Sequence, residues 1–127
     1  MSDRPVRAIL DASAIIAFTR GSIHVGEVIA EANDEYAAAG LPIPCLVEAS
    51  RAVAASDHLD LLVRHAATSV LAPQPEDWRA LTAIFDTVGR LDAASAMLAA
   101  LDLDCQVLTS QPGLYGGLAG GGPVIPV

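Results

Sequence analysis

Lysine is absent from this chain, and aromatic side chains and cysteine are scarce. All seven basic residues are arginines, set against fifteen aspartates and glutamates, which gives a formal net charge of −8. This balance argues against a protein that binds DNA regardless of sequence, because such binding depends on neutralising phosphates with basic side chains. It is compatible with an acidic metal site or with a basic protein partner.

The scarcity of aromatic residues limits how the core is built. Aromatic residues make up 4% of the 127 residues, although 53% are hydrophobic. The core must therefore consist of alanine, valine, leucine and isoleucine. The length is that of one ordinary domain, and we expect residues 1–127 to form a single domain.

Cysteine pairs and long apolar runs are also missing. Cys45 and Cys105 stand far apart and show no spacing typical of a zinc site. Charged residues interrupt the N-terminus, so no secretory leader is expected. The longest uncharged run, Cys105–Val127, contains too much glycine and proline for a membrane helix. The sequence therefore predicts a reduced, cytoplasmic protein that does not enter a membrane.

Short apolar runs alternate with segments of helical periodicity. Strands are expected at Val6–Leu10, Leu41–Ile43, Ser69–Ala72, Gln106–Thr109 and, as an edge strand, Pro123–Pro126. Helices are expected over residues 13–19, 25–36, 44–56, 57–66, 75–88 and 91–103, with Asp57 as a cap and Gly40 and Gly89 as helix ends. This alternation favours a mostly parallel sheet of four to five strands with helices on both faces, an α/β three-layer sandwich.

One carboxylate falls within an apolar stretch near the start of the chain. Asp11 follows the first expected strand and precedes the apolar residues 14–18. Burial of an unpaired carboxylate is strongly unfavourable, so Asp11 needs a partner. The carboxyl ends of parallel strands and the amino ends of the helices lie along one edge of such a sheet. Glu48 and Asp92, near the starts of two expected helices, belong to that same edge.

Each of these acids also has a purely structural explanation. Asp92 suits a helix N-cap, and Glu48 is favoured near a helix start by the helix dipole. Together, however, three carboxylates at one edge repel each other unless a cation lies among them. Oxygen ligands suit Mg²⁺ or Mn²⁺. We therefore expect Asp11, Glu48 and Asp92 to hold one of these ions.

Three blocks of the sequence also resemble the motifs of a known family. "AILDASAIIAF", "LPIPCLVEASR" and "RLDAASAMLAALDLDCQVLTSQPGLY" are similar, in order and spacing, to motif blocks of PIN domains. The match covers nearly the whole chain and is strongest to the small VapC-like toxins of toxin–antitoxin pairs. The resemblance implies a PIN-like fold and a metal-dependent endoribonuclease. It assigns the catalytic acids to Asp11, Glu48 and Asp92, and places Ser13 and Thr109 beside them.

Position 111 departs from the pattern of that family. Many relatives have "T-x-D" after the fourth strand, whereas this chain has "TSQPGLY", with Gln111 in place of the acid. An amide accepts a hydrogen bond or ligates a metal weakly, but it brings no charge. An alternative therefore stays open, in which the chain is a catalytically weak or inactive PIN-like module that binds a protein.

The implied reaction is hydrolysis of RNA phosphodiester bonds. A divalent ion held by Asp11 and Asp92 would lower the pKa of a bound water. Glu48 would reach the ion directly or through water, and is the expected base. Ser13 would either bond Asp11 or cap the first helix. The implied partners are RNA, a second copy in a homodimer, and a cognate antitoxin whose basic segment inserts an arginine among the acids.

Other sites with an acid at a strand end fit less well. A phospho-accepting receiver domain needs a lysine, which this chain lacks. Asp102 and Asp104, which mimic the D-x-D of a topoisomerase–primase site, precede the fourth strand instead of following a strand. The glycines of residues 116–122 lead into no expected helix, which argues against a dinucleotide fold.

Overall fold

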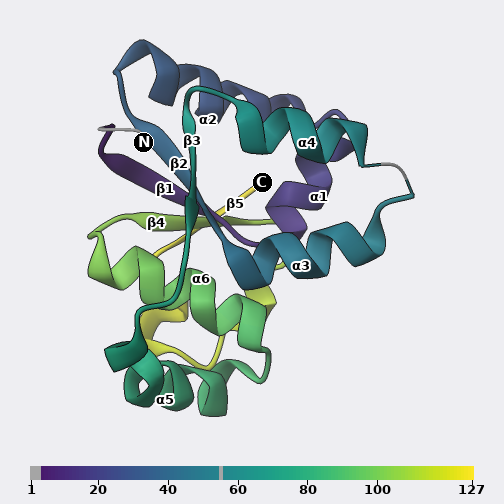
Figure 1. The fold of residues 1–127 in the computed structure, drawn as a ribbon. Coiled ribbons are helices and arrows are strands. Elements are labelled where there is room, and N and C mark those ends of the chain that lie inside the picture. Colours follow the sequence, from purple (N-terminus) through teal and green to yellow (C-terminus); the bar gives the residue numbers. More distant parts are fainter. Residues whose placement is uncertain (1–3, 55) are drawn as a thin grey trace.

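The fold is taken from a computed structural model, which describes residues 4–54 and 56–127. Strands and helices alternate along the chain (Figure 1). In order, they are β1 (Val6–Leu10), α1 (Ala12–Thr19), α2 (Ile23–Asp34), β2 (Ala38–Pro42), α3 (Ile43–Ala52), α4 (Asp57–Arg64), β3 (Thr68–Leu71), a 3-10 turn η1 (Pro75–Asp77), α5 (Trp78–Val88), α6 (Leu91–Asp102), β4 (Gln106–Thr109), the 3-10 turns η2 (Pro112–Tyr115) and η3 (Ala119–Gly121), and β5 (Val124–Pro126).

The strands form one five-stranded sheet in the order β3-β2-β1-β4-β5, and every neighbouring pair is parallel. Helices α5 and α6 lie on one side of the sheet, and α2 and α4 on the other (Figure 1). The predicted α/β three-layer sandwich is therefore confirmed, with a sheet that is wholly parallel. The strand order reverses between β1 and β4, and such a switch point opens a crevice at the carboxyl ends of the two strands.

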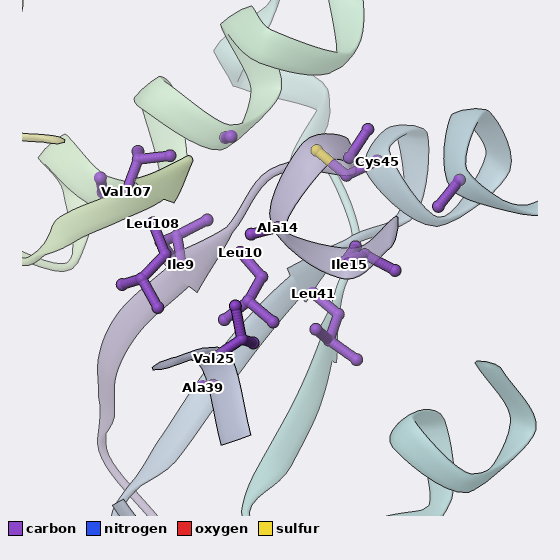
Figure 2. Close-up of a cluster of buried hydrophobic side chains, with 14 of the residues drawn as sticks. Ile9, Leu10, Ala14, Ile15, Val25, Ala39, Leu41, Cys45, Val107 and Leu108 are labelled. Carbon is purple, nitrogen blue, oxygen red and sulfur yellow. The ribbon is translucent and has the colours of Figure 1, made fainter. Parts of the chain in front are cut away.

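Aliphatic side chains from β1, β2 and β4 fill the core beside α1 (Figure 2). Leu10, Leu41 and Leu108 are fully buried there. On the opposite face of the sheet, α6 contributes small buried side chains, among them Ala93 and Ala96. Small residues at this contact allow the helix to approach the sheet closely. The amino end of α6 is thereby held at the edge of the sheet.

Strand β2 differs most from the prediction. It begins three residues earlier than expected and includes Gly40, which was predicted to end the preceding helix. That helix, α2, ends at Asp34. Alanine and glycine have little strand propensity, but every residue of β2 is buried between two parallel neighbours. A Cβ on Gly40 would lie 2.7 Å from Leu71 Cδ1 and 2.8 Å from Ile9 Cδ1, so glycine permits the close packing.

Among the other helices, α3 ends at Ala52, four residues before the predicted end at position 56, whereas α5 ends where it was predicted to end. Gly89 ends α5 in the left-handed conformation, with φ at 82°. Pro75 opens a 3-10 turn instead of α5 itself, and Asp57, the expected cap, is the first residue inside α4. Within the described ranges, no helix combines the length and the apolar character needed to cross a membrane.

Replacing Gly40 with alanine should destabilise the protein. The new methyl group would meet the ends of Leu71 and Ile9, and Ile9 is fully buried and has little room to move. Overpacking of this kind lowers the free energy of unfolding by about 1–3 kcal/mol. Urea denaturation of the purified variant measures the change.

Gly26→Ala in α2 is the matched control. A Cβ at Gly26 meets no atom within 4 Å, and alanine is favoured over glycine inside a helix by about 0.5–1 kcal/mol. The same substitution should therefore raise stability at position 26 and lower it at position 40. Equal urea midpoints for the two variants would contradict the tight packing of β2.

Candidate functional site

Asp11 accepts hydrogen bonds from α1 and from η2 at the switch point between β1 and β4. Its Oδ1 caps α1, where it accepts hydrogen bonds from the Ala14 N–H at 3.0 Å and from the Ser13 hydroxyl at 2.6 Å. Its Oδ2 accepts a hydrogen bond from the Tyr115 hydroxyl at 2.7 Å. The residue is only 2% exposed. These three donors are the partners that the buried carboxylate requires.

The ends of β1 and β4 are joined by a chain of hydroxyl groups. The Ser13 and Thr109 oxygens lie 3.2 Å apart, and Ser13 Oγ accepts the Ser110 N–H at 2.9 Å. Because the Ser13 hydrogen is directed to Asp11, Thr109 is the donor to Ser13. The Gln111 N–H in turn donates to Thr109 Oγ1 at 3.0 Å. The backbone of Gln111 thus belongs to this network, while the residue itself is exposed.

Asp92 lies in the first turn of α6 and is 7% exposed. Arg90 binds both of its oxygens, with Nε donating to Oδ1 at 3.1 Å and Nη2 donating to Oδ2 at 3.3 Å. These hydrogen bonds, followed by the attraction of the Asp92 charge, raise the pKa of Arg90, and the charges of Glu48 and Asp11 raise it further. Partial burial opposes the shift. The Arg90 guanidinium is therefore attracted by all three of the predicted acids.

Glu48 is the most exposed of the three predicted acids. Its side chain is 38% exposed, and its Oε1 lies 3.3 Å from Nη1 of Arg51, one helical turn away on α3. Across residues 4–54 and 56–127, no three acidic, histidine or cysteine side chains are grouped closely enough to hold a metal ion. The structure therefore brings Asp11 and Asp92 to the same edge but does not assemble the three carboxylates into one ligand set.

Cys45 lies between the two buried acids. Its thiol donates a hydrogen bond to the Asp92 backbone carbonyl at 3.2 Å. Burial raises the pKa of Cys45 well above its usual value, and the charges of Asp11 and Asp92 raise it further. A thiol that stays protonated is neither a nucleophile nor a metal ligand. Cys45 therefore serves as a packing and hydrogen-bonding partner of α6.

A groove of about 420 Å³ opens beside Ser13, Ser110 and Gln111. It is lined by Ser13, Ile16, Ala17, Arg20, Gly21, Ser22, Ser110 and Gln111. A more apolar cavity of about 210 Å³ lies elsewhere, between the start of α3, the end of β3 and α6, and none of the three acids lines it. None of the three acids lines the first groove either, and it borders the hydroxyl network through Ser13, Ser110 and Gln111.

The donor set at this edge fits a hard divalent cation. The Arg90 guanidinium already acts as a stand-in cation, because it is bound by Asp92 and attracted by Glu48 and Asp11. All the donors of these acids are carboxylate oxygens, the ligands that Mg²⁺ and Mn²⁺ prefer. Asp11 Oδ2 accepts a hydrogen bond from Tyr115 and keeps further acceptor capacity. Asp11 and Asp92 are therefore the residues that would hold such an ion once Arg90 releases Asp92.

Comparison with known proteins supports the fold and does not name a family. No known protein family and no curated protein matches this sequence. The chain is similar to the crystal structure of PAE2754 from Pyrobaculum aerophilum, with a TM-score of 0.66 and 21% sequence identity. The similarity covers 94% of this chain and 91% of the other. At this identity, the likeness shows a shared fold alone.

Three residues of the site were not predicted from the sequence. Arg90 precedes Asp92 by two positions, and Tyr115 is one of only two tyrosines in a chain poor in aromatic residues. Both facts are visible in the sequence, but neither residue type indicates its partner. Cys45 was considered only as a possible disulfide or zinc ligand. The contacts of Tyr115 and Cys45 with the acids span more than forty positions, so they depend on the fold.

Tyr115 should stay protonated far above the pH at which tyrosine normally ionises. Burial raises the pKa of Tyr115, and the charge of Asp11 and its hydrogen bond raise it further. In the unfolded chain, by contrast, this phenol ionises at about pH 10. The shift therefore leaves stability unchanged below that pH, and stability falls as the pH rises above it.

Tyr115→Phe tests this pH dependence. At neutral pH, the variant should be less stable by about 1 kcal/mol, because Asp11 loses a hydrogen bond. Between about pH 9 and pH 11, the variant should lose less stability than the wild-type protein, because it has no phenol to ionise. Urea denaturation across this range measures both effects, and Cys45 contributes equally to both proteins. Parallel pH profiles above pH 10 would contradict the role given to Tyr115.

Proposed function

We propose that this protein is a PIN-like, VapC-like endoribonuclease that hydrolyses RNA phosphodiester bonds with Mg²⁺ or Mn²⁺. The observation that carries the proposal is the pair of buried carboxylates, Asp11 and Asp92, beside the switch point of a parallel sheet. With Glu48, they attract one cationic group, the Arg90 guanidinium. Acids that converge on a cation at such a switch point support a site for phosphate chemistry.

In this proposal, Asp11 and Asp92 hold the divalent ion, and Glu48 reaches it directly or through water. When bound, the ion supplies an acidified water and neutralises charge that develops on the phosphate. Glu48 orients and deprotonates the attacking water, for which its partial exposure is suitable. Ser13 and Tyr115 hold the Asp11 carboxylate in position from opposite sides.

The groove beside Ser13, Ser110 and Gln111 offers a path for the RNA backbone. Arg20 supplies a cation there, and Ser22 and Ser110 supply hydrogen-bond donors suited to phosphate oxygens. Because the net charge is −8, the affinity for RNA depends on such local contacts and not on the overall field of the protein. The choice of RNA over DNA follows from the resemblance to VapC-like toxins.

The same proposal implies partners and a location. A cognate antitoxin would cover the acids with a basic segment. The chain would form a homodimer, and the toxin and the antitoxin would act in the cytoplasm. Arg90 already occupies the place that we expected for an arginine of the antitoxin. The second candidate function, a catalytically weak or inactive protein-binding module, is favoured by Gln111 and by the lack, among the described residues, of three acids grouped closely enough to hold a metal ion.

Glu48→Gln tests the nuclease directly. Glu48 is partly exposed and paired only with the exposed Arg51 within the described part of the chain, so the fold should tolerate the change. Loss of a catalytic base should lower the rate of Mn²⁺-dependent RNA cleavage by about 10²–10⁴-fold. Glu27→Gln, an exposed change of equal charge on α2, is the control. Cleavage that persists in EDTA, or that is equal in both variants, would contradict the proposal.

Gln111→Asp should strengthen the proposed metal site. The new carboxylate would stand at the end of β4, where the Gln111 backbone bonds Thr109. Its charge should tighten Mn²⁺ binding by about tenfold and raise the cleavage rate. Gln106→Asp places the same charge at the opposite end of β4 and should leave Mn²⁺ affinity nearly unchanged. Calorimetric titration with Mn²⁺ compares the two, and equal affinities would exclude position 111 from the site.

A further inference from the structure

We infer that Arg90 is an exchangeable counter-ion of Asp92 that makes the proposed metal site selective for divalent cations. It neutralises Asp92 while the site holds no metal, and a divalent ion displaces it. The inference rests on the proposed function for the identity of the cation, and it adds a residue that determines which cation the site accepts.

The two buried carboxylates are stabilised by different kinds of partner. Asp11 is held by neutral donors fixed in the fold, the Ala14 N–H and the hydroxyls of Ser13 and Tyr115. In the described residues, the hydrogen bonds to the Asp92 side chain all come from Arg90. A carboxylate that is 7% exposed is strongly destabilised without a partner. Asp92 therefore depends on a cation, and the cation that it has belongs to a flexible side chain.

The position of Arg90 allows it to leave without disturbing the fold. The residue precedes the first turn of α6 with an extended backbone, at φ −137° and ψ 133°. Its side chain is 47% exposed, and the contact with Asp92 spans only two residues. Rotation of the side chain is enough to move the guanidinium from Asp92 into water. No helix or strand has to shift.

The charge of an incoming ion decides whether it replaces Arg90. A monovalent ion carries the same charge as the guanidinium but lacks its two directed hydrogen bonds, so it gains nothing by the exchange. A divalent ion doubles the attraction to Asp92 and also gains from the charges of Asp11 and Glu48. Arg90 thus excludes Na⁺ and K⁺ and sets the concentration of divalent ion at which the site fills.

Arg90→Ala tests the exchange, with Mn²⁺ alone as the probe and calorimetry and thermal unfolding as the measurements. Without Mn²⁺, the variant should melt at a lower temperature than the wild-type protein, because Asp92 has lost its counter-ion. With Mn²⁺, it should bind about five- to tenfold more tightly, because no guanidinium has to be displaced. The rise in melting temperature caused by Mn²⁺ should grow accordingly, and moderate KCl should now stabilise the variant.

Two variants serve as controls. Arg64→Ala removes the same charge on α4, where the arginine bonds a backbone carbonyl of its own helix, and Mn²⁺ affinity should change less than twofold. Arg90→Lys keeps the charge but cannot form the bidentate hydrogen bonds to Asp92. Its affinity for Mn²⁺ should lie between those of the wild-type and Arg90→Ala proteins. It also carries the test if the alanine variant fails to fold.

The outcomes separate this inference from the proposed function. If wild-type and Arg90→Ala proteins bind Mn²⁺ equally, Arg90 is a structural ion pair and the inference is wrong, while the proposed metal site stands. If neither protein binds Mn²⁺, both the inference and the metal-dependent function are wrong. Tighter binding by Arg90→Ala, with Arg64→Ala unchanged, supports the exchange whether or not RNA is cleaved.

Discussion

The carboxylate of Asp11 is the constraint on which the rest of this site depends. One carboxylate oxygen caps the start of α1 and accepts a hydrogen bond from the Ser13 hydroxyl. The other accepts a hydrogen bond from the Tyr115 hydroxyl in the η2 turn. Through Ser13, the network continues to Thr109 at the end of β4. A single buried charge therefore links β1, α1, β4 and the C-terminal region. Without it, the hydroxyl groups of this edge have no common acceptor.

The parallel sheet explains why a charge is tolerated at this place. Strand ends and helix starts leave backbone and side-chain donors that point toward the same edge, and β1 and β4 separate there because the strand order reverses. The acid on α6 reaches this edge because the small side chains of that helix let it lie close to the sheet. The architecture thus supplies donors for one acid and requires a cation for the other, Asp92.

Much of this architecture follows from local patterns in the sequence. The β1 and β4 strands are short apolar runs with clear boundaries, and Gly89 ends α5 where a glycine in the left-handed region was expected. Strand β2 was misjudged because Ala38–Gly40 has low strand propensity, and its conformation comes from burial between neighbours that the local sequence does not reveal. Propensity was overridden there by tertiary packing.

The positions of the acids in the site could be predicted from the sequence, but their partners could not. Topology alone indicated that Asp11 and Asp92 share an edge, because strand ends and helix starts can be read from the sequence. Their partners could not be inferred, because the choice between Arg90, a metal and a hydroxyl group depends on side-chain directions in the folded protein. The lack of a three-acid ligand set among the described residues likewise depends on side-chain positions that the sequence does not reveal.

The bond between Tyr115 and Asp11 spans 104 positions of the chain. A ribosome makes Asp11 104 positions before Tyr115, so the buried acid lacks one of its donors while the chain between them is synthesised. Strands β1 and β4, which lie next to Asp11, likewise pair only after α6 has been synthesised. A chain synthesised only as far as α6 therefore cannot present the completed site, and any activity that depends on it begins only after Tyr115 has been made and has folded against Asp11.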